Sequence, residues 1–103
     1  YRLPVKVVIL NNGTLGMVRQ WQELFFQGKY SQTCLPQIPD YVRLAEAYGA
    51  KGFRATKPEE VPEVLRKGFA ADGPVLIDVI TDPGEMVYPM VPAGAGLTEM
   101  LLV

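Results

Sequence analysis

The sequence contains no histidine and only one cysteine, Cys34, and these two scarcities exclude several kinds of active site. Without histidine, the chain cannot itself supply a Ser-His or Cys-His nucleophilic pair or a zinc–histidine site. A single cysteine forms neither an intrachain disulfide nor a cysteine cluster around a metal. Cys34 falls in a predicted loop, where we interpret it as incidental. Such low cysteine use is typical of the reducing cytosol, so we expect a cytoplasmic location.

An excess of charge is also missing. The 103 residues have a formal net charge of −1 at pH 7, whereas binding to nucleic acid needs a basic face. We therefore expect no nucleic-acid partner. No apolar run is long enough to span a bilayer and no signal peptide is recognisable, so we expect no membrane association.

What the sequence does contain is 49% apolar residues, arranged in alternating strand and helix patterns. Two nearly continuous apolar runs, residues 5–10 and 75–80, predict interior parallel strands that are covered on both faces. A shorter strand is predicted at residues 51–55. The alternation with helices predicts an α/β fold, a three-layer αβα arrangement with a parallel sheet and right-handed crossovers.

Three helices are predicted between and after these strands. The first begins near Thr14 or Leu15 and ends at Gly28. The second follows the N-cap residue Asp40 and ends at Gly49. A capping box at residues 56–59 introduces the third, whose apolar stripe runs from residue 61 to residue 69. Residues 81–96 are too rich in proline and glycine to be regular, and residues 97–103 are expected to add a last helical turn or two.

Polar residues follow the first strand directly, where ligands bind in open α/β sheets. Asn12 offers a carbonyl oxygen suited to Mg²⁺ or Ca²⁺, and the backbone of Thr14 offers a second oxygen. The first amides of the following helix favour a phosphate, and Gly16 lets a ligand approach the backbone closely. The alternative is an Asn-Gly turn with asparagine capping and no ligand, which chemistry alone favours.

Other side chains also allow two interpretations. Met17 and Trp21 lie one helical turn apart, so they either belong to the core or line the mouth of a pocket beside the strand end. Asp78 lies inside a strand, where we expect it to be paired rather than to act as a general base. Residues 88–96 are interpreted as a lid, an interface segment or a flexible terminus.

Residues 9–22 closely resemble the catalytic subunit of the acetohydroxyacid synthase (acetolactate synthase) family. They read Ile-Leu-Asn-Asn-Gly-Thr-Leu-Gly-Met-Val-Arg-Gln-Trp-Gln, and the part after the asparagine pair is the more specific. The similarity continues through Gly-Pro-Val-Leu at 73–76 and Pro-Met-Val-Pro at 89–92, and it covers essentially the whole chain.

The resemblance implies an enzyme that uses thiamine diphosphate and Mg²⁺. It implies that the side chain of Asn12 and the backbone carbonyl of Thr14 bind the metal. Gly16, Met17 and Val18 are then expected to lie against the diphosphate or its pocket. Three positions match residues that line the substrate channel and contact inhibitors in the family: Met17, Trp21 and Ala93.

The implied reaction is thiamine-dependent decarboxylation of pyruvate and its condensation with a second 2-oxo acid, for branched-chain amino acid synthesis. A homodimer or homotetramer with a regulatory subunit is implied. The family's opening Gly-Asp-Gly motif, its catalytic glutamate and its FAD-binding domain are missing here.

We therefore expect residues 1–103 to be the C-terminal part of the thiamine-diphosphate- and Mg²⁺-binding domain, with 82–103 as its tail. The thin sheet and the abrupt start with Tyr-Arg-Leu-Pro agree with a chain that begins within a domain. It is expected to hold no catalytic residue and to be inactive alone. Two alternatives remain: another thiamine-diphosphate enzyme, of the glyoxylate carboligase or pyruvate oxidase type, and a non-catalytic α/β association module.

Overall fold

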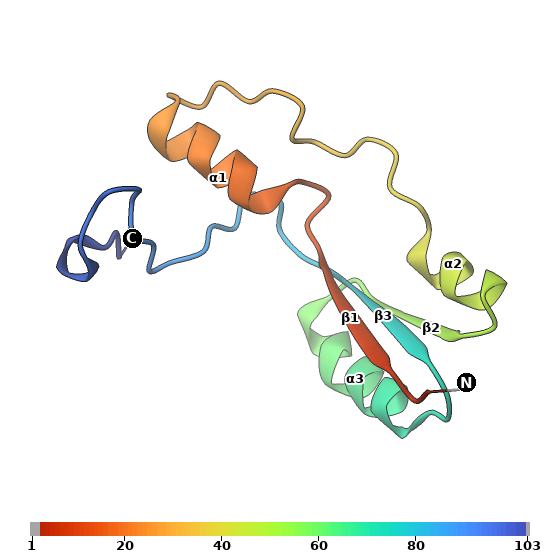
Figure 1. Cartoon of the computed structure of the whole chain (residues 1–103). Helices are drawn as coiled ribbons and strands as arrows, with labels where there is room; N and C mark the ends of the chain where they lie inside the picture. Colours follow the sequence, from red (N-terminus) through yellow and green to blue (C-terminus); the bar gives the residue numbers. More distant parts are fainter. Residues whose placement is uncertain (1–2, 103) are drawn as a thin grey trace.

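A three-stranded parallel sheet forms the centre of the computed structural model, which describes residues 3–102 (Figure 1). The strands are β1 (Lys6–Asn11), β2 (Lys51–Ala55) and β3 (Val75–Ile80), and their order in the sheet is β1-β3-β2. Ile9 of β1 and Arg54 of β2 both pair with Asp78 of β3. Because all the strands are parallel, their carboxyl ends lie at one edge. The predicted parallel sheet is confirmed.

Helices cover opposite faces of this sheet, which confirms the predicted αβα layering. α3 (Val61–Ala70) packs on the face that carries Val75, Ile77 and Val79, and these strand residues form the buried core cluster. α2 (Tyr41–Ala47) lies on the other face. There the backbone of Val42 comes so close to Gly52 that a β-carbon on this glycine would lie 2.8 Å from it.

β1 differs from its prediction as an interior strand covered on both faces. It pairs only with β3 among residues 3–102, and the side chains of Val7 and Leu10 are 46% and 71% exposed. Of the three strands in the described residues, β3 alone has a strand on each side. The apolar composition of a strand shows how much surface it is able to bury, whereas its place in the sheet depends on which other strands pair with it.

α1 (Gly16–Phe25) begins slightly later than predicted and projects away from the sheet, as Figure 1 shows. Its end is fixed by two residues in the left-handed region, Gln27 (φ 56°) and Gly28 (φ 69°), which agrees with the predicted stop at Gly28. The chain then runs back towards α2 without a helix or strand, so Cys34 lies in a loop, as predicted.

The caps of the other helices are partly as predicted. Asp40 caps α2, because its carboxylate accepts hydrogen bonds from the N–H groups of Val42 and Arg43. The chain enters α3 through the 3₁₀ turn η1 (Pro58–Glu60). Glu60, and not the predicted Glu59, accepts from Thr56 and Lys57. The predicted box is shifted by one residue because the chain makes this 3₁₀ turn before α3 begins.

The tail after β3 is irregular, as predicted, apart from the 3₁₀ turn η2 (Leu97–Glu99). Met90 and Leu101 exchange backbone hydrogen bonds of 3.0 and 2.7 Å, which close the end of the tail into a loop. Of the helical turns expected at 97–103, one 3₁₀ turn is present, and residue 103 lies outside the described part. No helix within residues 3–102 is long and apolar enough to cross a membrane.

Candidate functional site

The candidate site begins with the turn that follows β1. The side-chain oxygen of Asn11 accepts from the N–H of Gly13 at 3.3 Å, and that of Asn12 accepts from the N–H of Thr14 at 3.1 Å. Gly13 has a φ of 67°, which favours glycine at this position. The asparagine-capped turn expected as an alternative is therefore present. It does not exclude a ligand, since an amide oxygen has a second lone pair.

The N-terminus of α1 follows this turn and is open to an anion. Leu15 occupies the N-cap position without a side-chain cap, and the first turn contains no acidic residue. Within the described chain, the N–H groups of Gly16, Met17 and Val18 have no hydrogen-bond partner. Unpaired amides at a helix N-terminus bind phosphate groups well, because they point outward at the positive end of the helix dipole.

The asparagine and the helix start lie against each other. A β-carbon on Gly16 would come within 2.7 Å of Nδ2 of Asn12, so only glycine leaves room for this side chain. The hydroxyl oxygen of Thr14 is enclosed and has no hydrogen-bond partner among residues 3–102. The arrangement therefore places the side-chain amide of Asn12 beside an uncapped helix N-terminus, and groups of these two kinds suit a metal-bound diphosphate.

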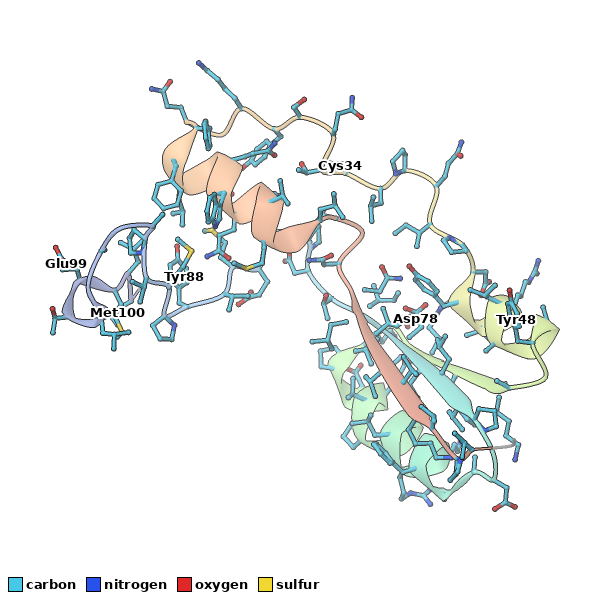
Figure 2. The ribbon with its side chains drawn as sticks, viewed as in Figure 1. Cys34, Tyr48, Asp78, Tyr88, Glu99 and Met100 are labelled. Carbon is cyan, nitrogen blue, oxygen red and sulfur yellow. The ribbon has the colours of Figure 1, made fainter. Side chains whose placement is uncertain are left out.

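The loop before α2 holds this turn in place through its backbone. The N–H of Leu15 donates to the carbonyl of Thr33 at 2.8 Å, and the N–H of Leu35 donates to the carbonyl of Gly13 at 2.9 Å. Cys34 lies between these bonds, and its side chain is exposed (Figure 2). This pairing could not be predicted from the sequence, because loop residues carry no periodic pattern.

Charged side chains join the strand ends beneath the turn. Asp78 is fully buried within the sheet (Figure 2), and it accepts from Nδ2 of Asn11 and from Nε of Arg54. The pairing predicted for Asp78 is confirmed. Arg54 also donates to the N-cap residue Asp40 at 2.9 Å. The amide of Arg43, followed by the guanidinium of Arg54, lowers the pKa of Asp40.

Sequence reasoning missed the parts that Asn11 and Arg54 play in this network. A charged residue in the middle of a short strand was the available signal for Arg54. Its partner could be identified only from the register of β2 against β3.

The apolar side of α1 is exposed rather than buried. Met17, Val18 and Trp21 line an open groove of about 580 Å³, together with Gln22, Phe26 and Lys29. Trp21 is 46% exposed, and its ring stands edge-on to that of Phe25 at 6.0 Å. Met17 and Trp21 are therefore not buried among residues 3–102, and both line this groove.

The C-terminal tail, on which Figure 2 labels Tyr88 and Met100, also contributes residues beside α1. A smaller hollow of about 230 Å³ is lined by residues of α1 and of the tail: Trp21, Phe25, Phe26, Pro92 and Ala93. The structure thus brings Ala93 to Trp21. Gln20, which sequence reasoning missed, is buried and bonded to Val87 of the tail.

No three histidine, cysteine, aspartate or glutamate side chains gather as a metal cluster in residues 3–102. The candidate metal ligands are instead a neutral amide and a backbone carbonyl. Asn12 and Thr14 are two positions apart in one turn, and each offers one oxygen. Such a pair fits part of a Mg²⁺ coordination sphere, with phosphate oxygens or water as further ligands.

A strand that ends in a polar turn, followed by an uncapped helix N-terminus, defines an α/β domain built for a phosphate-bearing ligand. The sequence profile of "Thiamine pyrophosphate enzyme, C-terminal TPP binding domain" matches residues 1–79, and the chain belongs to this family. This confirms the resemblance inferred from residues 9–22.

Individual relatives are more specific. The chain is 48% identical over 100 residues to "Acetolactate synthase isozyme 2 large subunit" of Escherichia coli (strain K12), covering 97% of this chain and 18% of that protein. It is 48% identical over 99 residues to "Acetolactate synthase catalytic subunit, mitochondrial" of Saccharomyces cerevisiae (strain ATCC 204508 / S288c), covering 95% of this chain and 14% of that protein. The chain therefore spans less than a fifth of the length of these relatives.

A solved structure shares the fold. The thiamine diphosphate-dependent 4-hydroxybenzoylformate decarboxylase of Rhodococcus jostii RHA1 matches with a TM-score of 0.70 and 38% sequence identity. The match covers 80% of this chain and 15% of the decarboxylase.

Proposed function

We propose that these residues form the metal- and diphosphate-binding part of an enzyme of the acetolactate synthase type. That enzyme decarboxylates pyruvate and joins the remaining two-carbon unit to a second 2-oxo acid, for branched-chain amino acid synthesis. The observation that carries the proposal is the side chain of Asn12 packed against the uncapped N-terminus of α1. The 48% identity to acetolactate synthase subunits supports this choice of reaction.

The residues present fit the cofactor. Asn12 through its side-chain oxygen and Thr14 through its carbonyl would bind Mg²⁺, and the amides of Gly16, Met17 and Val18 would bind the diphosphate. When bound, thiamine diphosphate would supply the electron sink that lets a 2-oxo acid lose carbon dioxide. This chain's own residues bind and orient the cofactor by electrostatics and positioning. We assign no proton transfer to any of residues 3–102, and we propose that the catalytic residues lie in other parts of the full-length protein.

The groove of α1 is the proposed substrate and inhibitor channel. Met17 and Trp21 give it an apolar wall, and the tail adds Ala93 beside Trp21. An apolar wall excludes water and leaves the shape of the acceptor to decide how well it fits. We therefore assign Trp21 a part in the choice of the second 2-oxo acid.

The remaining parts of the proposal concern the full-length protein. FAD is proposed to bind outside these residues, and residues 82–103 are proposed as the C-terminal tail of the domain. The E. coli relative is named a large subunit, which supports a smaller regulatory partner. We propose a homodimer or homotetramer in the cytoplasm, the location for which low cysteine use is the support.

The test of cofactor binding uses two variants of the full-length protein, Asn12→Ala and Asn12→Asp. Asn12→Ala should weaken binding of Mg²⁺ and thiamine diphosphate by more than about tenfold, since even residues that only orient metal ligands are worth that much. Asn12→Asp retains an oxygen ligand and should bind far better than the alanine variant. Titration calorimetry measures both affinities, and circular dichroism checks that the fold is retained. Equal affinity in all three proteins would refute the assignment.

Product analysis tests the reaction. The similarity to a decarboxylase means that the fold alone is compatible with decarboxylation without condensation. Full-length protein incubated with pyruvate should release acetolactate. Acetaldehyde as the main product would instead favour a simple decarboxylase, and oxidation or glyoxylate condensation would favour the other thiamine-diphosphate enzymes. Absence of any cofactor binding would favour a non-catalytic association module.

A further inference from the structure

We infer that Asp78 and Arg54 are positioning residues for the cofactor site. Through the side chain of Asn11, they hold the turn that presents Asn12 and Thr14. The inference rests on the proposed function for the ligand that this turn binds. The hydrogen bonds that hold the turn are observed whether or not this ligand binds.

The carboxylate of Asp78 is placed to do this. It is fully buried, and each of its oxygens has a donor. Oδ1 accepts from Nδ2 of Asn11 at 3.0 Å, and Oδ2 accepts from Nε of Arg54 at 2.9 Å. A buried carboxylate is destabilising unless such bonds satisfy it, so these contacts are strongly favoured over a free orientation.

Asp78 also decides which way the amide of Asn11 points. An ionised carboxylate only accepts hydrogen bonds, so the NH₂ group of Asn11 must face it. The oxygen of Asn11 is then directed to the N–H of Gly13, from which it accepts at 3.3 Å. A partner able to donate would allow the opposite orientation, in which this bond to the turn is lost. The negative charge of Asp78 thus favours the orientation of the Asn11 amide in which its oxygen bonds the N–H of Gly13.

The backbone strengthens this link to β3. The carbonyl of Asn11 accepts from the N–H of Thr81 at 3.0 Å. Asn11 is therefore tied to β3 through both its side chain and its main chain. The next residue is Asn12, so little freedom remains between β3 and the proposed metal ligand.

Arg54 connects the same point to the rest of the fold. Its Nη2 donates to Asp40 at 2.9 Å, and Asp40 in turn caps α2. The strand ends of β1, β2 and β3 and the N-terminus of α2 are thereby joined by one chain of charge-assisted bonds. Partners of this kind behind a metal ligand fix its orientation and raise metal affinity.

A matched control lies at the other end of β1. Nζ of Lys6 donates to the carbonyls of Ala71 and Gly73 at 2.6 and 2.7 Å, so it also links β1 to the segment leading into β3. Lys6→Met removes this link, which lies at the end of β1 away from the turn. Asp78→Asn removes the link beside the turn while keeping the size of the side chain.

The experiment compares these variants in the full-length protein. Asp78→Asn should weaken the affinity for Mg²⁺ and thiamine diphosphate by about 10- to 100-fold, with the rate at saturating cofactor retained. Lys6→Met should leave this affinity unchanged. Asn11→Ala should cause the same loss as Asp78→Asn, and it remains usable if Asp78→Asn fails to fold. In the Asn11→Ala background, Asp78→Asn should cause no further loss, because it acts through Asn11.

Amide hydrogen exchange at Gly13 and Thr14, without cofactor, gives a second readout. Exchange should be faster in Asp78→Asn and Asn11→Ala and unchanged in Lys6→Met. Unchanged exchange and affinity in Asp78→Asn would overturn the inference, as would a full further loss of affinity in the Asn11→Ala background. If the unaltered protein binds no thiamine diphosphate, the proposed function fails, and the exchange rates still decide the role of Asp78.

Discussion

The side-chain amide of Gln20 pairs with both backbone groups of Val87, a residue 67 positions later in the chain. Its nitrogen donates to the carbonyl at 3.0 Å, and its oxygen accepts from the N–H at 2.8 Å. Only 2% of Gln20 is exposed, and its nitrogen also contacts the sulfur of Met90. This one side chain therefore holds the tail against α1. It thereby also keeps Ala93 of the tail beside Trp21.

Gln20→Leu should release the tail. The change keeps the size of the side chain but leaves the backbone groups of Val87 without their partner, which costs about 1–3 kcal/mol in the stability of the docked tail. Hydrogen exchange at Val87 should accelerate accordingly. Gln22→Leu is the control, because Gln22 instead bonds Ser31 and Thr33 of the loop between α1 and α2. Equal exchange rates at Val87 in both variants would refute the role of Gln20 in holding the tail on α1.

Gly16→Ala should separate cofactor binding from folding. Alanine is the better helix former, by up to about 1 kcal/mol, so the helix itself should not suffer. Its β-carbon, however, would lie 2.7 Å from Nδ2 of Asn12 and would displace this side chain. We expect weaker binding of Mg²⁺ and thiamine diphosphate in titration calorimetry, with an unchanged or higher melting temperature.

Gly68→Ala gives the opposite pattern. A β-carbon there would lie 2.5 Å from Cδ1 of Ile77, within the core under α3. The melting temperature should fall while cofactor affinity in the folded protein is kept. A loss of affinity in Gly68→Ala alone would contradict the proposed placement of the site.

Trp21→Leu should alter substrate choice without loss of cofactor. Trp21 lies beyond the first turn of α1, so the amides proposed for the diphosphate are untouched. The groove loses the large Trp21 side chain from its wall. A difference of one apolar group in such a pocket changes the discrimination between substrates by about tenfold or more. The ratio of products from competing 2-oxo acids measures this effect. Phe69→Leu, an exposed aromatic on α3, is the control and should change nothing. Unaltered product ratios and inhibitor sensitivity would reduce Trp21 to a structural residue.

Glu60 should make the start of α3 sensitive to acid. The N–H and hydroxyl of Thr56 donate to its carboxylate, and these bonds lower the pKa of Glu60. A lowered pKa in the folded state means that the stabilisation is fully present above the unfolded-state value of about 4.3 and is lost as the pH falls through the folded value.

The NMR resonance of the Thr56 amide should therefore shift as the pH falls through the pKa of Glu60 in the folded state. Glu60→Gln should abolish the shift. Glu59→Gln makes the same charge change one residue earlier, where the described residues show no bond to Thr56, and should leave the shift intact. Retention of the shift in Glu60→Gln would refute the assignment of Glu60 as the capping residue of α3.

Local patterns predicted most of the elements. β3, β2 and the cap of α2 by Asp40 agree with their predictions, because an apolar run, a short strand pattern and a capping residue each act within a few positions of the chain. The cap of α3 moved from Glu59 to Glu60, since a 3₁₀ turn precedes the helix and the sequence does not distinguish the two arrangements. The place of β1 at the sheet edge depends on partners that composition does not specify.

The candidate site was predicted in its local part only. Asn12, Thr14 and Gly16 lie within five consecutive positions, so their proximity follows from a turn and a helix start. The bonds of Asn11 to Asp78 and of Gln20 to Val87 each span 67 positions and depend on strand register and tail placement. A single sequence holds no pattern that reports such contacts.

The exposed face of β1 has a practical consequence. Its Val7, Val8 and Leu10 are open to solvent, and its outer backbone edge pairs with no other strand among residues 3–102. Lys6, its only charged residue, is occupied with the carbonyls of Ala71 and Gly73. An apolar strand edge of this kind is a template for pairing with another molecule. Residues 1–103 produced by themselves should accordingly aggregate as their concentration rises, with strand β1 as the point of contact.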